Sequence, residues 1–428
     1  MTEFVEIFNE QNIKYIQYQF TTITGEFKTV EFPVKIWHDL KGGTGIDGSS
    51  LGFLTTEQSD MRIVPDYDTF AIIPWNPKVG RFICDLTNNK GKPYPTCPRG
   101  LLKKTLLEIK ELNYEFQIRP ELEWYFVKKD FTPGDKAKYM DTLPIDKFQD
   151  LRRQITDDMI YMNIGVKTIH HEVGLGQQEV EFVSDNALRQ ADNVQTGKLI
   201  TKVRAFYQNI ISTYMPKPFE QMAGNGLHIH QSLIRNGENA FSDKQKGISD
   251  ILRYYIGGIQ YHINAITAIL NPTTNSYKRL TPHHEAPVYV SWGIGNRTAL
   301  IRVPGYENSA RIEYRAGDGM MNIYLGVALL LAAGLDGIKN EIEPNQPTKK
   351  NVDLLTDDQR KELKIEKLPE SLEESLQAFE KSNLIKKTLS KELMKIYLNI
   401  KYSELQDYEI AKANGTEKEW ELNKYLYL

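Results

Sequence analysis

Residues 311–315 read RIEYR, a run in which charged and apolar side chains alternate. Side chains at alternate positions of a β-strand point to the same face. A strand here would therefore carry Arg311, Glu313 and Arg315 on one face, and Ile312 and Tyr314 on the other. A solvent-exposed sheet face would give the same alternation, so the pattern indicates a site only if other strands repeat it.

The same alternation recurs in three other segments, ELEW (121–124), EVEF (179–182) and LHIHQ (227–231). If the apolar faces of these strands pack against helices, their polar faces converge on one cleft. The paired ionisable side chains are Glu121 and Glu123, Glu179 and Glu181, and His228 and His230. Four strands of this kind favour a functional cleft over a set of solvated faces.

The chemistry of such a cleft follows from its side chains. Several carboxylates that face one another cannot all stay ionised without cations. Many carboxylates and few imidazoles suit Mg²⁺ or Mn²⁺ better than zinc. Arginines opposite the metal indicate an anionic substrate, and the combination favours phosphoryl transfer. The sequence contains no GxxxxGK[ST] loop, so it does not predict a P-loop enzyme.

Composition limits the class of protein. The chain has 428 residues, 40% hydrophobic and 25% charged, which is ordinary for a folded domain or two. A net charge of −3 gives no basic field for nucleic acid or an anionic membrane, so neither is expected as a partner. Two cysteines, Cys84 and Cys97, exclude a disulfide framework and favour the cytoplasm. The longest apolar run, residues 324–338, predicts a buried helix.

The order of elements predicts an α+β fold. Residues 15–34 predict a hairpin that turns at Gly25, and residues 40–53 predict a loop. The cluster of turn residues and prolines at 88–100 marks a domain boundary. We therefore expect a small β-rich domain at 1–95 and a larger domain of strands and helices at 96–428. Helices are expected at 4–14, 98–112, 145–163, 187–214 and 250–270, with a helical tail after about residue 340.

Several longer motifs resemble those of one family. KPFEQMAGNGLHIHQS (217–232) is similar to the ATP-region signature of glutamine synthetases, and IDGSSLGFLTTEQSDM (46–61) to their N-terminal signature. The segments HHEVGLGQQEVEF (170–182), NSYKRL (275–280), HHEAP (283–287), NRTALIRVP (296–304) and RIEYR follow in the family's order. The resemblance spans nearly the whole chain and is strongest for the bacterial and archaeal type I enzymes. It implies a β-grasp-like N-terminal domain, and a catalytic domain with a curved, mainly antiparallel sheet backed by helices.

The resemblance implies two metal sites for Mg²⁺ or Mn²⁺. The first, next to the substrate glutamate, matches Glu123, Glu172 and Glu179. The second, on the phosphates of ATP, matches Glu121, His228 and Glu313. Glu181 is interpreted as a hydrogen-bonded neighbour rather than a ligand.

The remaining matches imply substrate contacts. Arg279, Arg297 and Arg315 match residues that bind the glutamate carboxylate and the transferred phosphoryl group, and Gly224 matches the glutamate loop. Arg302, Arg311, His230 and Ser232 match ATP contacts. Asp47 matches the residue that deprotonates ammonium in a neighbouring subunit's site. Ser50 and Tyr139 match further ammonium positions, and Glu285 matches the flap that closes the site.

These matches imply ligation of ammonium to glutamate through a γ-glutamyl phosphate, in a homo-oligomer of two stacked hexameric rings. Some positions depart from the family. Ala223 replaces a usual Asn, His283 and His284 occupy the flap, and RAGDGMMNIY (315–324) replaces RxPDPxxNPY. Two alternatives therefore stay open: a ligase that joins glutamate to a larger amine such as methylamine, ethanolamine or a polyamine, and a non-catalytic regulatory relative. The presence of all six matched metal ligands argues against the second.

Overall fold

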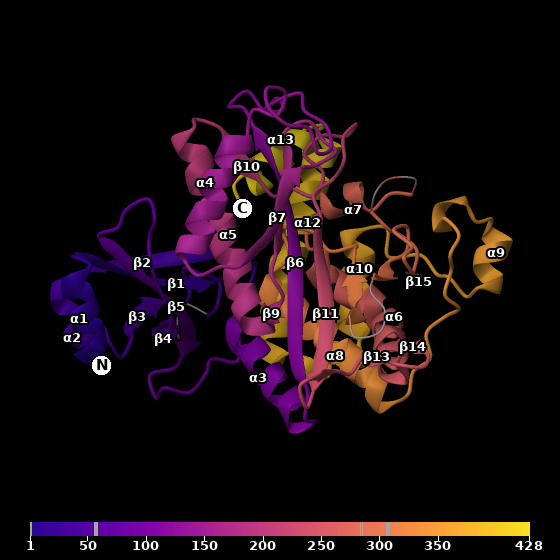
Figure 1. The fold of residues 1–428 in the computed structure, drawn as a ribbon, viewed down its shortest axis with the longest axis horizontal. Helices are drawn as coiled ribbons and strands as arrows, with labels where there is room; N and C mark the ends of the chain where they lie inside the picture. The colour runs from indigo at the N-terminus through magenta and orange to yellow at the C-terminus, as the bar shows by residue number, and fades with distance from the viewer. Residues whose placement is uncertain (1, 55–58, 283, 285, 305–308) are drawn as a thin grey trace.

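The computed structural model describes residues 2–54, 59–282, 284, 286–304 and 309–428. The N-terminal part forms a five-stranded sheet in the order β2-β1-β5-β4-β3, in which β1 and β5 are parallel and the other pairs antiparallel. In Figure 1 this indigo part lies at the left, beside the larger remainder. Its elements are α1 (Thr2–Glu10), β1 (Tyr15–Thr21), β2 (Phe27–Pro33), α2 (Trp37–Leu40), β3 (Thr44–Asp47), β4 (Asp60–Ile72) and β5 (Val79–Thr87).

The larger part is built on a second sheet whose main path runs β15-β16-β17-β11-β6-β8-β7. All of these pairs are antiparallel except β15 with β16. The long strands β6 and β11 run side by side through its middle (Figure 1). The strands are β6 (Glu115–Val127), β7 (Val166–His171), β8 (Gln177–Phe182), β9 (Asp185–Asn186), β10 (Ile211–Thr213), β11 (Leu227–Arg235), β12 (Glu238–Asn239), β15 (Trp292–Ile294), β16 (Ile301–Val303) and β17 (Ile312–Tyr314); β13 (Ser242–Asp243) and β14 (Gly247–Ile248) pair separately.

The larger part also contains helices, several of which pack against this sheet, and none of those described is long and apolar enough to cross a membrane. They are α3 (Pro98–Glu111), α4 (Gln149–Tyr161), α5 (Ala187–Tyr207), α6 (Asp250–Leu270), α7 (Ser276–Arg279), α8 (Ile323–Lys339), α9 (Asp357–Glu362), α10 (Leu372–Lys381), α11 (Asn383–Thr388), α12 (Lys391–Ala413) and α13 (Glu417–Tyr425). The apolar run of the sequence forms α8, which is buried over nearly all of its length. Asn322 caps it by accepting hydrogen bonds from the N–H groups of Tyr324 and Leu325.

The alternating sequence pattern decides which face of the sheet is polar. Phe116, Ile118, Leu122 and Trp124 of β6 are almost fully buried, as are Ile312 and Tyr314 of β17. Burial of a large apolar side chain contributes about 1.5–3 kcal/mol, so a one-residue slip in register would be strongly unfavourable. The intervening charged residues are therefore fixed on the opposite face.

The structure confirms the α+β architecture, the hairpin at Gly25 and the helices at 98–112 and 250–270. Several expected bounds were wrong in detail. The helix expected at 4–14 ends at Glu10, before Asn12 takes a positive φ of 53°, and the helix expected at 145–163 covers Gln149–Tyr161. The segment 40–53 is not all loop, because Thr44–Asp47 pairs with β4. The helix expected at 187–214 ends at Tyr207, since Asn209 adopts a positive φ of 56° and Ile211–Thr213 turns into a strand beside β6.

A buried arginine joins the two parts of the chain. Arg99 of α3 donates two hydrogen bonds to Asp192 of α5, at 2.9 and 2.8 Å. It also donates to Asp85 and Asp66 of the N-terminal sheet, at 2.7 and 2.9 Å. Lys103, which is about one-third exposed, contacts the same two aspartates from the outside.

We expect Arg99→Met to lower the free energy of unfolding by about 3–5 kcal/mol, because it leaves the buried carboxylate of Asp192, which Lys103 does not contact, without its cation. Lys103→Met is the matched control, and it should cost less than about 1 kcal/mol because water reaches its partners. Urea denaturation followed by circular dichroism measures both. Equal losses in the two variants would contradict a special role for the buried cation.

Candidate active site

The polar faces of β6, β8, β11 and β17 open onto one cavity of about 760 Å³. It collects side chains that are far apart in the sequence, as the alternating pattern predicted. The site residues expected from sequence that line it are Glu121, Glu123, Tyr139, Glu172, Glu179, Gly224, His228, Arg279, Arg297, Arg302, Glu313 and Arg315.

One end of this cavity holds Glu121, His228 and Glu313, each offering a ligand atom within 4.8 Å of the others. The β6–β11 register places Glu121 directly opposite His228. Burial would raise the pKa of Glu121, but hydrogen bonds from His228 and His230 hold it well below its usual value. Burial also opposes ionisation of Glu313, and the positive charge of Arg315 lowers its pKa to about 2. Both carboxylates are therefore ionised at neutral pH.

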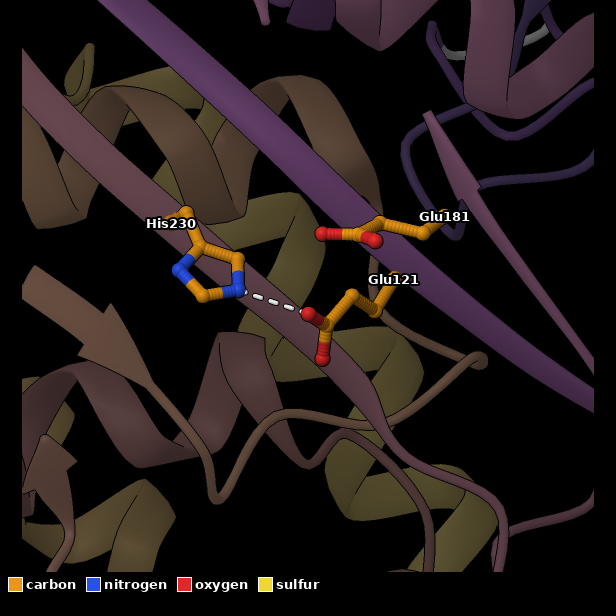
Figure 2. Close-up of side chains that lie close together, drawn as sticks. All are labelled: Glu121, Glu181 and His230. Carbon is orange, nitrogen blue, oxygen red and sulfur yellow. Dashed lines mark hydrogen bonds and ion pairs between the residues drawn. The ribbon is translucent and has the colours of Figure 1, made fainter. Parts of the chain in front are cut away.

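His230 lies beside this group and fixes the position of Glu121. Arg311 Nε donates to His230 Nδ1 at 3.2 Å, so the ring proton is on Nε2, which donates to Glu121 Oε1 at 2.6 Å. Burial lowers the pKa of His230, which agrees with this neutral tautomer. Figure 2 shows the bond between His230 and Glu121, with Glu181 beside them. Glu181 is ion-paired with Arg119 at 2.8 Å and with Lys167.

The other end of the cavity gathers His170, Glu172 and Glu179, whose ligand atoms lie within 4.8 Å of one another. Burial, together with the charges of Glu123, Glu121 and Glu172, raises the pKa of Glu179 well above its usual value. Glu123 faces Glu179 across the β6–β8 ladder, but its Oε2 accepts the Gly226 N–H at 2.6 Å. Among the described residues, His170 therefore joins Glu172 and Glu179 in this group, while one oxygen of Glu123 is bonded to the Gly226 N–H.

Arginines complete the charge balance. Arg302 donates to Glu313 at 2.7 Å, and Arg315 donates to its other oxygen. Arg279 is buried and donates to the carbonyls of Ala316 and Arg315, at 2.6 and 3.3 Å.

Two glycines allow the backbone to approach these groups. A Cβ at Gly224 would lie 2.7 Å from the Arg279 side chain, and one at Gly226 would lie 2.8 Å from Arg279 Nη2 and 2.9 Å from His228 Nε2. At Gly224 the Cβ would also lie 2.6 Å from the backbone oxygen of Pro216, so a larger residue does not fit there, whereas at Gly226 the side chains of Arg279 and His228 would have to shift. The close approach of the loop 223–226 to Arg279 and His228 therefore depends on glycine.

A neighbouring cavity of about 560 Å³ extends the site along β11. Ser232 and Arg311 line it, together with Gln117 and Lys244. His228, His230 and Ser232 alternate on one strand face, so β11 leads from the carboxylate groups into this second cavity.

Two of the expected site residues lie elsewhere. Asp47 and Ser50 belong to the N-terminal part, and Asp47 lines a separate open cavity, which has no described lining residue in common with the main one. The hydroxyl of Ser49 and then that of Ser50 lower the pKa of Asp47 to about 2. Glu285 and His283 lie outside the described residues, while the exposed His284 lines the main cavity.

Sequence reasoning missed two residues of the site. Arg119 precedes Glu121 by two positions on β6, so the strand alternation that singled out Glu121 and Glu123 also includes it. His170 lies two positions before Glu172, so the same strand alternation could have indicated it. Tyr139, which lines the cavity, packs its ring on His170 at a centroid distance of 5.5 Å.

The two groups of ligand atoms fit hard divalent cations, because they consist of carboxylates with one imidazole each. The raised pKa of Glu179 has its cause in burial next to other carboxylates, which a cation would offset. We therefore expect Mg²⁺ or Mn²⁺ to raise the melting temperature of chelator-treated protein by several degrees.

A double variant, Glu172→Gln with Glu179→Gln, should show a much smaller rise, and its metal-free form should melt no lower than the metal-free wild type. Glu108→Gln with Glu115→Gln, two exposed carboxylates outside the cavity, is the matched control and should respond to metal like the wild type. Differential scanning fluorimetry measures all three. An undiminished metal effect in the first double variant would contradict a site at Glu172 and Glu179.

The sequence and the structure of this chain are similar to those of one protein family. A family model described as "Glutamine synthetase, catalytic domain" matches residues 95–425, and one described as "Glutamine synthetase, beta-Grasp domain" matches residues 12–89. The chain is 41% identical to a glutamine synthetase of Thermotoga maritima, covering 99% of this chain and 98% of that one. It is 42% identical to one of Pyrococcus furiosus, covering 98% of each. It is also similar to a solved structure described as "GmaS/ADP complex", with a TM-score of 0.89 and 28% identity over 99% of each chain.

Proposed function

The chain belongs to the glutamine synthetase family, and we propose that it joins ammonium to the γ-carboxylate of L-glutamate with hydrolysis of ATP to ADP and phosphate. The observation that carries this proposal is the single cavity in which two groups of metal-type ligands face Arg279, Arg302 and Arg315. A phosphoryl transfer between two anions needs this arrangement, because cations must offset the charge of both reactants.

ATP is proposed to lie along β11. Ser232 and Arg311 would contact it in the 560 Å³ cavity, and its phosphates would extend past His230 to Glu121, His228 and Glu313. The alternation of His228, His230 and Ser232 on one face of β11 supports this path. Mg²⁺ or Mn²⁺ bound at this end would offset phosphate charge and polarise the transferred group.

Glutamate is proposed to lie between Gly224 and the other carboxylate group. Arg279, with Arg297 and Arg315, would bind its carboxylates, and a second metal would be held by Glu172 and Glu179 together with Glu123 or His170. In the first step a γ-carboxylate oxygen attacks the terminal phosphorus of ATP. The new O–P bond gives γ-glutamyl phosphate, and ADP leaves.

In the second step ammonia attacks the acyl carbon and inorganic phosphate leaves. Ammonium must first lose a proton, and Asp47 of a neighbouring subunit is proposed to accept it. Tyr139 and Glu179 line the main cavity, where the amine would bind. The Ser50 hydroxyl donates a hydrogen bond to Asp47 Oδ2. Glu285 is proposed to close the site against water, which would otherwise hydrolyse the acyl phosphate. We also propose that the chain divides near residues 95 and 96, and that it assembles into stacked hexameric rings.

A larger amine is the second candidate acceptor. The exposed side chains of Met140 and Val173 line the main cavity and would contact an alkyl group. Ala223 offers no polar side chain, and its carbonyl oxygen accepts the Tyr125 hydroxyl at 2.7 Å. Both features would suit a substituted amine better than they suit ammonium.

The test is an ATP-hydrolysis assay with glutamate and a panel of amines: ammonium, methylamine, ethanolamine and putrescine. We expect kcat/KM for ammonium to exceed that for each of the others at least ten-fold. A higher kcat/KM for any substituted amine would overturn the assignment of ammonium as the acceptor and would support a glutamate–amine ligase instead. Absence of glutamate-dependent hydrolysis with every amine would overturn the ligase itself.

A further inference from the structure

A smaller cavity of about 250 Å³ lies where the N-terminal hairpin meets α5 and the loop before α8. Among the residues that the structure describes, it shares none of its lining with the main cavity. The hairpin turn is held at this place by side chains of the larger part. Gln195 donates to Thr21 Oγ1 and Gly25 O at 2.9 and 3.0 Å, and Asn322 donates to Thr22 O at 2.9 Å. These hydrogen bonds fix the position of the hairpin turn, which forms one wall of the cavity.

Two lysines from successive turns of α5, Lys198 and Lys202, line this cavity. Both ammonium groups lie over the ring of Tyr214, at 5.5 and 5.6 Å from its centroid. Lys198 is 9% exposed and donates to the carbonyl of Gly319, and Lys202 donates to the carbonyl of Tyr427 at 3.2 Å. Among the described residues, no carboxylate lies within 4.0 Å of either ammonium.

Two lysine ammonium groups this close together are unfavourable without an anion that balances their charge. Like charges four residues apart on a helix repel, and burial of Lys198 removes much of the water that would screen this repulsion. Burial lowers the pKa of Lys198 to about 7 and that of Lys202 to about 8. Glu26, although ion-paired with Lys28, favours the charged form of Lys202, and Asp318 favours that of Lys198, but the effect of burial is larger for both lysines. An anion between the two ammonium groups would remove the repulsion.

We propose that this cavity binds a small anion, a carboxylate or a phosphate, between Lys198 and Lys202. Its volume equals that of about eight water molecules, which admits a short dicarboxylate or inorganic phosphate but not a nucleotide. Phe27, Leu199 and Met320 also line it, so a short hydrocarbon segment could be accommodated.

One departure from the family pattern forms part of the wall. Gly319 lies in RAGDGMMNIY, where the resembling family has proline, and a Cβ there would lie 3.2 Å from Tyr214 Cβ. Its carbonyl accepts the bond from Lys198, and the loop begins at Arg315 of the main cavity. A bound anion would therefore contact both the N-terminal hairpin and the loop that leaves the candidate active site.

The test is isothermal titration calorimetry of the full chain at pH 7 with inorganic phosphate and, separately, with succinate, at constant ionic strength in chloride. We expect saturable binding of at least one anion with a Kd of about 1 mM or tighter. The double variant Lys198→Met with Lys202→Met should weaken this binding at least ten-fold. Lys104→Met with Lys412→Met removes the same charge from exposed positions and should bind like the wild type. The tighter of the two anions identifies the source of the ligand.

Methionine keeps most of the lysine stem and removes a buried charge, so the double variant should melt no lower than the wild type without anion. If it does not fold, Lys202→Met alone should still weaken binding at least three-fold. No saturable binding by the wild type, or equal binding by the lysine variants, would overturn the proposal. If anions bind only in the main cavity, the lysine variants will bind them as tightly as the wild type does. Because neither ATP nor an amine is present, the outcome is independent of the proposed ligase activity.

Discussion

Changing Glu313 to glutamine is expected to lower kcat/KM for the ligation by about a thousand-fold or more, because arginine and metal contacts to a transferred phosphoryl group are worth that much. Glu313 is 1% exposed at its side chain and accepts hydrogen bonds from both Arg302 and Arg315. It also belongs to the ligand group with Glu121 and His228. Glutamine keeps the shape but removes the charge that holds all of these cations.

The same change removes a buried ion pair, so a loss of stability must be separated from a loss of function. Glu404→Gln is the matched control, because Glu404 is buried and bonded to Lys401 at 3.0 Å, outside the main cavity. It should lower the melting temperature by a comparable amount and change kcat/KM less than about three-fold. Mn²⁺ titration should show weaker metal binding in Glu313→Gln only. Activity of Glu313→Gln within ten-fold of wild type would contradict the proposed role.

The sequence pattern predicted side-chain direction better than it predicted partners. Alternation has a period of two on any strand, so Glu121, Glu179, His228 and Glu313 could be placed on polar faces without knowing the sheet. The register that sets Glu121 opposite His228 depends on contacts between residues more than a hundred positions apart. No local pattern contains that information.

Local backbone geometry explains the remaining differences. The helix over 187–207 contains no glycine or proline near its end, and it stops where Asn209 takes a left-handed conformation. Thr44–Asp47 becomes a strand only because β4 lies beside it, although Gly43 and Gly45 indicate a loop. Tertiary pairing overrides propensity at such short segments. The sequence also did not predict that the two lysines of α5 line a cavity, because lysines four residues apart are common on exposed helix faces.

Active sites shared between subunits should make two inactive variants active when they assemble together. Asp47 is exposed, ionised through its Ser49 and Ser50 bonds, and outside the main cavity of its own chain. If it accepts the ammonium proton, it must do so in a neighbour's cavity. Asp47→Ala and Glu179→Ala proteins should each lose nearly all activity. In rings that combine them equally, roughly one site in four would receive Asp47 from one variant and an intact cavity from the other.

A second mixture distinguishes shared sites from sites within one chain. Wild type combined equally with the double variant Asp47→Ala/Glu179→Ala should keep roughly a quarter of its activity if sites are shared, but roughly half if each chain forms its own. Subunits must be exchanged by denaturation and refolding, and mixed rings verified by native mass spectrometry with two affinity tags. No recovered activity in verified rings of the two single variants, or half activity in the second mixture, would place the acceptor base within the chain. Asp47 could then not be that base, because its carboxylate borders a different cavity.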